Sequence, residues 1–546
     1  MMDLLRIGLL VVGSWLALMP AAAQLGMTDI ERARQAGILL VGNNADPKAL
    51  DPQLVTGVVE SKILTALFEG LCGDDPADDD GCTPGVAERW SANTDFTEWT
   101  FHLNRAAKWS DGTPLTARDF LFSYERMLHP SFAAPYVEML YFIRGAEDFN
   151  KGKSQDFASV GVRAPDPHTL VISLREKVPF LPSITRHYTW FPIPEHVVRK
   201  FGGHGDRFTA WTRPENIQSN GPFRLKEWRV SHIVETTRNP YYWDAANVAL
   251  NGIRFYPTEN PYTEARAFLA GQLHTIYSLP ADQIPWVKKN HPEFLKQDPY
   301  LGTVFVRLNV KRHGLDDPRV REALSLALDR SLLCQHILEG YTPARSMTPP
   351  MGDYRAKEVL RQDVERAQKL MAEAGYPGGA GFPRLSMLIG RASGRANAEA
   401  VQSMWRDSLG VIVDLQNMEW SAYLTAQQTL NFDMAMAGWI GDYLDPTTFL
   451  YMWTDGNGNN NTGWVNKEYE SILTDAASRN DPNQRLQRLS EAEEILTREL
   501  PAIPLAWYSR NYLHHPSVLG WHPLVLDNHP WKTIHFATPT GPSAAP

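Results

Sequence analysis

Short apolar strands alternate with helical patterns between residues 385 and 439, and this order restricts the fold more than any other feature. The helix that stops at Gly410 carries one apolar face, and a second helical pattern runs from Trp420 to Leu430. Such alternation predicts a parallel sheet covered by helices, which is an α/β architecture. The expected strands are Leu385 to Ile389, Val411 to Leu415 and Phe432 to Trp439.

The last of these strands leads to a lone carboxylate, Asp442, which is followed by a turn at Asp445 and Pro446. Ligands of open α/β sheets bind beyond the carboxyl ends of the strands. Asp442 can neutralise an amine there, while the backbones of Gly438 and Trp439 offer N–H and C=O groups to an extended peptide. The simpler interpretation is a buried strand followed by a turn with a solvated aspartate.

The chain begins with the features of a secretory signal. Arg6 precedes an apolar run from Ile7 to Met19, and Ala21 to Ala23 form a small-residue cleavage site. The run is shorter than the ~20 residues that span a bilayer, and no cysteine follows it to carry a lipid. We therefore expect residues 1–23 to be a signal peptide and the mature protein to be periplasmic, without a lipid anchor. The formal net charge of −9 argues against nucleic acid as a partner.

The three cysteines are Cys72, Cys82 and Cys334. Cys72 and Cys82 bracket an acidic loop, GDDPADDDG, and an oxidising compartment favours a disulfide between them. Cys334 lies in a helical pattern and is expected to be a buried free thiol. The loop lacks the spacing and the distal glutamate of an EF-hand, so we predict no metal site there.

Six blocks of sequence resemble, in the same order, those of one protein family. That family is extracellular solute-binding protein family 5, which contains the periplasmic oligopeptide and dipeptide receptors of ABC importers. The likeness covers nearly the whole chain that follows the predicted signal peptide. The blocks are LDPQLVTGVVESKILTALFEGL (50–71), PGVAERW (84–90), WTFHLNRAAKWSDGTPLTARDF (99–120), SNGPFRLKEW (219–228), RNPYYWD (238–244) and DDPRVREALSLALDR (316–330).

The resemblance implies a two-lobed, type II periplasmic-binding-protein fold (a Venus flytrap) with an extra domain inserted in the first lobe. Lobe I would comprise residues 24–71, 196–301 and 531–546, the extra α/β domain residues 72–195, and lobe II residues 302–530. It also implies a monomeric receptor that needs no cofactor and delivers its ligand to the permease subunits of an ABC transporter in the membrane.

The family pattern W-x-x-D-Y places Asp442 at the α-amino group of a bound peptide. Trp439 and Trp420 match positions near the side-chain pockets, although both fit core packing as well. Glu60 and Tyr136 fall where ligand-facing residues of the other lobe lie. Glu60 would serve equally well as a cap for the helix that follows it. Asn460 and Asn461 are further polar candidates, but a Gly/Asn turn explains them too.

The sequence departs from the family where a peptide carboxylate would bind. Well-known oligopeptide receptors carry arginine at two positions that align here with Gln427 and Met436. Arg391 and Arg395, in the loop after the strand that ends at Ile389, are candidates to replace them, or are solvated loop residues. The departure leaves peptide length and ligand class open.

We predict a receptor that closes on short peptides and is not an enzyme. Alternatives within the same architecture are modified or cell-wall peptides, nickel complexes, haem and peptide-like antibiotics. An exported hydrolase is the alternative from another class, but the chain contains no G-x-S-x-G, H-E-x-x-H or C-x-x-C motif. A receptor that feeds a signalling partner would share the same closed surface.

Overall fold

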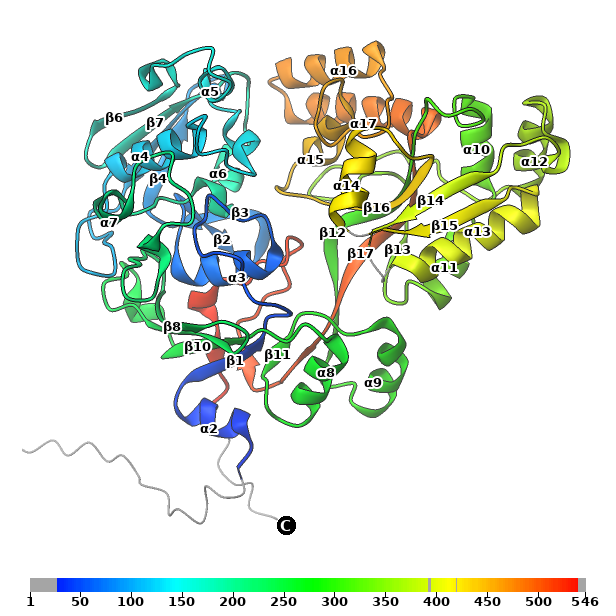
Figure 1. Ribbon diagram of the computed structural model, residues 1–546. Helices are drawn as coiled ribbons and strands as arrows, with labels where there is room; N and C mark the ends of the chain where they lie inside the picture. Colours follow the sequence, from blue (N-terminus) through cyan, green and yellow to red (C-terminus); the bar gives the residue numbers. More distant parts are fainter. Residues whose placement is uncertain (1–26, 391–393, 419, 539–546) are drawn as a thin grey trace, which may run out of the picture.

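The computed structural model describes residues 27–390, 394–418 and 420–538, so the predicted signal peptide lies outside the described residues. The chain forms two lobes joined by two long strands, β12 (Leu295–Leu308) and β17 (Ala502–His514) (Figure 1). These strands pair antiparallel from Leu295↔Leu513 to Arg307↔Ala502, and their register shifts between Pro299 and Thr303. The two-lobed α/β prediction is therefore confirmed.

One 11-stranded sheet runs through both lobes in the order β15-β14-β16-β12-β17-β11-β1-β10-β9-β8, with β13 paired to β17. In the first lobe, the chain places helices α2, α3, α8 and α9 beside the sheet (Figure 1). The bounds in this lobe are α2 (Asp29–Gln35), β1 (Ile38–Gly42), α3 (Val58–Leu67), β8 (Phe223–Arg229), β9 (Ile233–Arg238), β10 (Gly252–Tyr256), α8 (Pro261–Leu269), β11 (Thr275–Ile276) and α9 (Ile284–Asn290).

A second, four-stranded sheet in the order β4-β5-β7-β6 fills the outer part of the first lobe. The segment EWTFHL alternates buried and partly exposed residues, so Trp99, Phe101 and Leu103 all face the core, as a half-buried strand requires. The elements are β2 (Cys72–Asp75), β3 (Asp78–Pro84), β4 (Ala87–Ala92), β5 (Glu98–Leu103), α4 (Ala117–Leu128), α5 (Ala146–Asn150), β6 (Val162–Asp166), β7 (Thr169–Ser173), α6 (Leu181–Ile184) and α7 (Glu195–Phe201).

The other lobe contains the strand–helix alternation seen in the sequence. Strand β14 (Leu385–Ile389) pairs parallel with both β15 (Val413–Asn417) and β16 (Met434–Ile440), as predicted. The sheet becomes mixed where β16 meets β12 antiparallel. The remaining elements are α10 (Pro318–Leu326), α11 (Arg330–His336), β13 (Thr342–Pro343), α12 (Val364–Glu373), α13 (Arg395–Leu409), α14 (Trp420–Gln428), α15 (Thr447–Leu450), α16 (Lys467–Ser478) and α17 (Pro482–Glu499).

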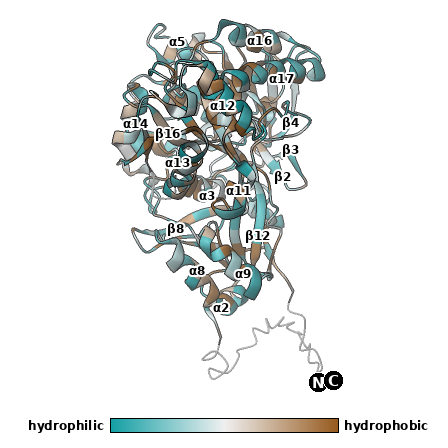
Figure 2. Ribbon diagram, turned by 90° about the vertical axis from the view of Figure 1, so that its right-hand side faces the viewer, coloured by the Kyte–Doolittle hydropathy of each residue, from teal (hydrophilic) through white to brown (hydrophobic). Residues whose placement is uncertain are grey.

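The outer helix faces of this lobe, such as those of α16 and α17, are largely hydrophilic (Figure 2). After β17, the strand β18 (Val518–Leu519) pairs antiparallel with β19 (His535–Phe536). Within the described ranges, no helix has both the length and the apolar character needed to cross a membrane.

The predicted disulfide is not formed: Cys72 and Cys82 are free thiols on the β2–β3 hairpin. The register pairs Cys72 with Pro84 and Cys82 with Asp74, so the two cysteines are diagonal neighbours. Diagonal positions of an antiparallel pair usually lie about 7–8 Å apart, wider than the usual Cα separation of a disulfide, about 4.4–6.8 Å. The two thiols form a hydrogen bond with each other instead, and burial together with this bond raises the pKa of Cys72. Cys334 is a buried free thiol, as predicted.

A buried charge cluster ties the hinge strand β17 to the first lobe. The Asp527 carboxylate lies 2.9 Å from Lys62 Nζ on α3 and 2.8 Å from Arg510 on β17. Burial alone would raise the pKa of Asp527, but the two cations outweigh it and hold that pKa well below its ordinary value. Burial in turn lowers the pKa of Lys62 to about 7.

Substitution of Asp527 should test how far folding depends on this cluster. Asp527→Asn leaves Lys62 and Arg510 buried without an anion, so we expect a loss of about 3 kcal/mol in the free energy of unfolding. Urea denaturation at pH 6, where Lys62 is charged, measures it, with Asp353→Asn at an exposed position as the matched control. Equal midpoints for the two variants would contradict a stabilising role for the cluster.

Candidate functional site

Asp442 lies two residues beyond β16, where the chain turns between the lobes. The N–H of Gly441 donates to the Leu301 carbonyl at 2.8 Å, and the N–H of Asp442 donates to Thr448 Oγ1 at 3.0 Å. The indole N–H of Trp439 donates to the Thr448 carbonyl at 2.8 Å. These bonds fix the backbone around Asp442, and none of them involves its carboxylate.

The Asp442 carboxylate has no ion-pair or hydrogen-bond partner among the residues that the structure describes. Its side chain keeps partial exposure, yet burial raises its pKa to about 7, with a further contribution from the negative charge of Glu138. Glu138 comes from the short 3-10 helix at Val137–Leu140 in the first lobe. An acidic group in this setting is most stable when a cation arrives to neutralise it.

Aromatic side chains of the first lobe surround this carboxylate and its neighbour. Burial raises the pKa of Tyr136 and of Tyr188, and the charge of Asp442 raises both further. The ring of Tyr443 stacks on Phe180 with a centroid distance of 5.5 Å and meets the edge of Phe142 at 6.0 Å. Asp442 therefore faces the opposite lobe rather than the outer surface.

The edge of β16 next to Asp442 is open. Strand β14 pairs with β16 only as far as Met436, and in the described part of the chain no strand pairs on that side from Ala437 to Ile440. A Cβ atom added to Gly438 would lie 2.4 Å from the hydroxyl oxygen of Tyr508, so only glycine fits without moving that ring. An extended ligand could add here as a further strand.

The other predicted residues have structural interactions of their own. The Glu60 carboxylate accepts the Lys48 N–H at 2.8 Å. Arg395 is exposed and pairs with Glu399 at 2.8 Å, one turn along α13. The Asn460 amide donates to three carbonyls of its own loop, including that of Trp464 at 3.0 Å, which supports the turn interpretation.

Three predictions remain without a structural description or a tested role. Arg391 lies outside the described residues, and so does the side chain of Trp420, whose backbone begins α14. Trp439 is partly buried against the core of its lobe, and its contact with a ligand stays a prediction. Among the described residues, no group of three or more His, Cys, Asp or Glu side chains is arranged to hold a metal ion.

Sequence reasoning missed Arg307. It is a single cation within the apolar strand segment VFVRL, it is 7% exposed, and its Nη1 donates to Gln427 Oε1 at 2.7 Å. Gln427 is one of the two positions where the family arginines are absent. A charged residue in the middle of a buried strand was the signal that could have identified it.

A chain with two lobes, paired hinge strands and an uncompensated charge between the lobes belongs to the class of solute-binding receptors. The sequence profile of the bacterial extracellular solute-binding proteins, family 5 (middle region), matches residues 81–461. The protein is a member of this family.

Three comparisons describe its relatives. The periplasmic oligopeptide-binding protein OppA of Salmonella typhimurium is 36% identical over 497 residues, which is 88% of this chain and 89% of that protein. The structure of the Escherichia coli murein tripeptide-binding protein MppA superposes with a TM-score of 0.80 at 32% identity, over 91% of this chain and 98% of that one. The Haemophilus influenzae OppA complex with RPPGFSPFR gives 0.79 at 32% identity, over 92% and 99%.

Removal of the Asp442 charge should stabilise the ligand-free protein. Because the folded state raises this pKa, the ionised carboxylate opposes folding once the pH exceeds its ordinary value, and the full effect is present above pH 7. We expect Asp442→Asn to raise the free energy of unfolding by about 2 kcal/mol at pH 8, less than the roughly 4 kcal/mol of an unscreened shift.

Most of the gain should disappear near pH 4, because the carboxyl group is protonated in the folded chain there and is only partly ionised in the unfolded chain. Urea unfolding at pH 4 and pH 8 provides the comparison, with Asp353→Asn as control. A destabilised Asp442→Asn variant at pH 8 would show that the carboxylate has a structural partner.

Proposed function

We propose that the protein is a periplasmic receptor that captures short peptides by their free amino group and delivers them to an ABC permease. The observation that carries this proposal is the Asp442 carboxylate, which has no cationic partner among the described residues and lies beside the open edge of β16. A peptide can satisfy both features, because its ammonium group can pair with the carboxylate and its backbone can form hydrogen bonds with the strand edge.

Closure of the lobes would report the bound state to the permease. A ligand that contacts Asp442 on one lobe and the region of Tyr136 on the other stabilises the closed population. The family and the relatives named above are binding proteins, which supports ligand capture rather than catalysis. We propose that the receptor acts as a monomer after its signal peptide is removed.

Cell-wall peptides are the second candidate ligands. The absence of arginine at Gln427 and Met436 alters the place where an ordinary oligopeptide carboxylate would bind, and one relative of similar fold binds a murein tripeptide. A murein peptide would use the same Asp442 contact, provided that its amino group is free.

Calorimetry with a mixture of di- to pentapeptides tests the Asp442 contact. We expect Asp442→Ala to lose at least ~2 kcal/mol of binding free energy, the scale for truncating one partner of a buried charge pair. N-acetylated peptides should bind the wild-type protein weakly for the same reason. Asp353→Ala is the matched control. If Asp442→Ala binds peptides with wild-type affinity, the proposed contact between Asp442 and the amino group is wrong.

The affinity should also depend on pH. Asp442 must be ionised to attract an ammonium group, and its pKa of about 7 means that it takes up a proton as the pH falls through that value. Between pH 7.5 and pH 5.5 the affinity for a free-amine peptide should fall about 15-fold, since the peptide amine is mostly protonated over this range while Asp442 loses its charge. The weaker affinity of the N-acetylated peptide should not fall, and a flat profile for both would contradict the assignment.

A further inference from the structure

Arg307 differs from the other buried arginines in how its charge is compensated. Within the described ranges, Arg126, Arg186 and Arg485 each face a carboxylate. Arg321 and Arg330 each donate to three carbonyl or hydroxyl oxygens. Among the residues that the structure describes, Arg307 donates only to the neutral Gln427 amide, and its Nε is buried without an acceptor.

The cost of this arrangement is high for a structural residue. A buried guanidinium carries five N–H donors and cannot give up its proton near neutral pH. No carboxylate among the described residues lies within ion-pair distance of Arg307, and burial lowers its pKa only to about 10. The residue is therefore a buried cation that lacks an anion.

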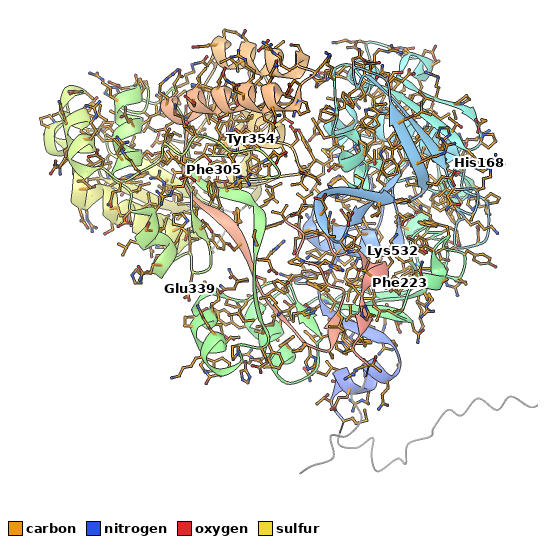
Figure 3. The ribbon with its side chains drawn as sticks, turned by 180° about the vertical axis from the view of Figure 1, so that it is seen from behind. His168, Phe223, Phe305, Glu339, Tyr354 and Lys532 are labelled. Atoms are coloured by element: carbon orange, nitrogen blue, oxygen red, sulfur yellow. The ribbon has the colours of Figure 1, made fainter. Side chains whose placement is uncertain are left out.

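The Arg307 guanidinium lies near one end of the open edge of β16. Arg307 lies on β12, and its guanidinium carbon lies 5.6 Å from the ring centroid of Phe305. Figure 3 labels Phe305 on this strand. Phe305 is opposite Ala437, the first residue of β16 without a β14 partner. The cation thus lies at one end of the open edge, and Asp442 lies beyond the other end.

Helix α14 covers the same end of the edge and holds the guanidinium in place. Its residue Gln427 is buried and accepts the Arg307 Nη1–H at 2.7 Å, while the Tyr423 hydroxyl donates to the Met436 carbonyl at 2.8 Å. Gln427 and Met436 are the two positions at which the expected arginines are missing. The positive charge is present in this chain, but it comes from a different strand.

We propose that Arg307 binds a carboxylate of the ligand, at the opposite end of the β16 edge from the amino-group contact at Asp442. The proposal rests on the proposed function, because it concerns the far end of the same bound peptide. The open edge and the residues that flank it suit an extended ligand of roughly three to five residues. The carboxylate can belong to the peptide C-terminus or to an acidic side chain near it.

Peptides with altered ends test the proposal. Tri-, tetra- and pentaalanine are compared by calorimetry as free acids and as C-terminal amides, together with amides that carry Glu or Gln at the last position. The wild-type protein should bind free acids about 30-fold more tightly than amides. If Arg307 contacts the terminal carboxylate, the Glu and Gln amides should bind with equal affinity. If it contacts an acidic side chain, the Glu amide should bind more tightly than the Gln amide, and the free acids should bind no more tightly than their amides.

Two substitutions should abolish this discrimination by different routes. Arg307→Gln removes the cation, and Gln427→Glu supplies an internal carboxylate that occupies it, so each should bind the preferred acid and its neutral counterpart equally within about twofold. Arg307→Lys, which keeps the charge, should retain part of the preference. Gln427→Glu should also raise the melting temperature of the ligand-free protein, because it pairs the buried cation. Arg312→Gln, at a more exposed ion pair with Asp433, is the control that keeps wild-type discrimination.

The outcomes separate the two proposals. Failure of the wild-type protein to bind any of the peptides would overturn the proposed function itself. A different result would overturn only the role of Arg307. In that case N-acetylation weakens binding as expected, but Arg307→Gln and Gln427→Glu keep the wild-type preference for free acids. A wild-type protein that binds free acids and both kinds of amide equally would overturn it as well.

Discussion

The antiparallel pairing of β12 with β17 is the interaction on which the rest of the structure depends. Both strands pass from one lobe to the other, so their ladder is at once part of two cores and the connection between them. The shift in register between Pro299 and Thr303 interrupts the ladder where the lobes meet. Fewer regular hydrogen bonds resist bending there, which suits a hinge that absorbs backbone rotation.

Some buried charges of the two lobes are paired within the protein, and others are not. Asp527, Asp445 and Asp51 are buried, and each is neutralised by an arginine within the described chain. Asp442 and Arg307 are not, and they lie toward opposite ends of the open β16 edge. Charges of opposite sign at the two ends of this edge would match the two ends of a zwitterionic peptide, and the proposed function explains both of them in the same way.

The local elements were predictable from the sequence, and the long-range contacts were not. Apolar periodicity is a local property, so β14 and the parallel order of its neighbours could be read directly. The pairing of β12 with β17 joins segments about 200 residues apart, and the contact of Lys62 with Asp527 spans 465 positions. No local pattern encodes such contacts. The register that keeps Cys72 and Cys82 diagonal is likewise a property of the folded hairpin. The sequence shows Arg307 as a charged residue within an apolar strand, but only the structure identifies Gln427 as its partner.

The packing of Tyr443 against Phe142 and Phe180, which also contact each other, has a consequence for the receptor. Aromatic pairs of this kind contribute about 0.5–1.5 kcal/mol each beyond their buried area. All three rings belong to the protein, so their attraction between the lobes does not require a ligand. A receptor that works by closure would then populate its closed conformation without ligand, and this conformation would present to the permease nearly the same surface as the ligand-bound receptor. Idle copies would compete for transporter docking, so uptake would saturate, or even decline, as receptor abundance rises above that of the transporter.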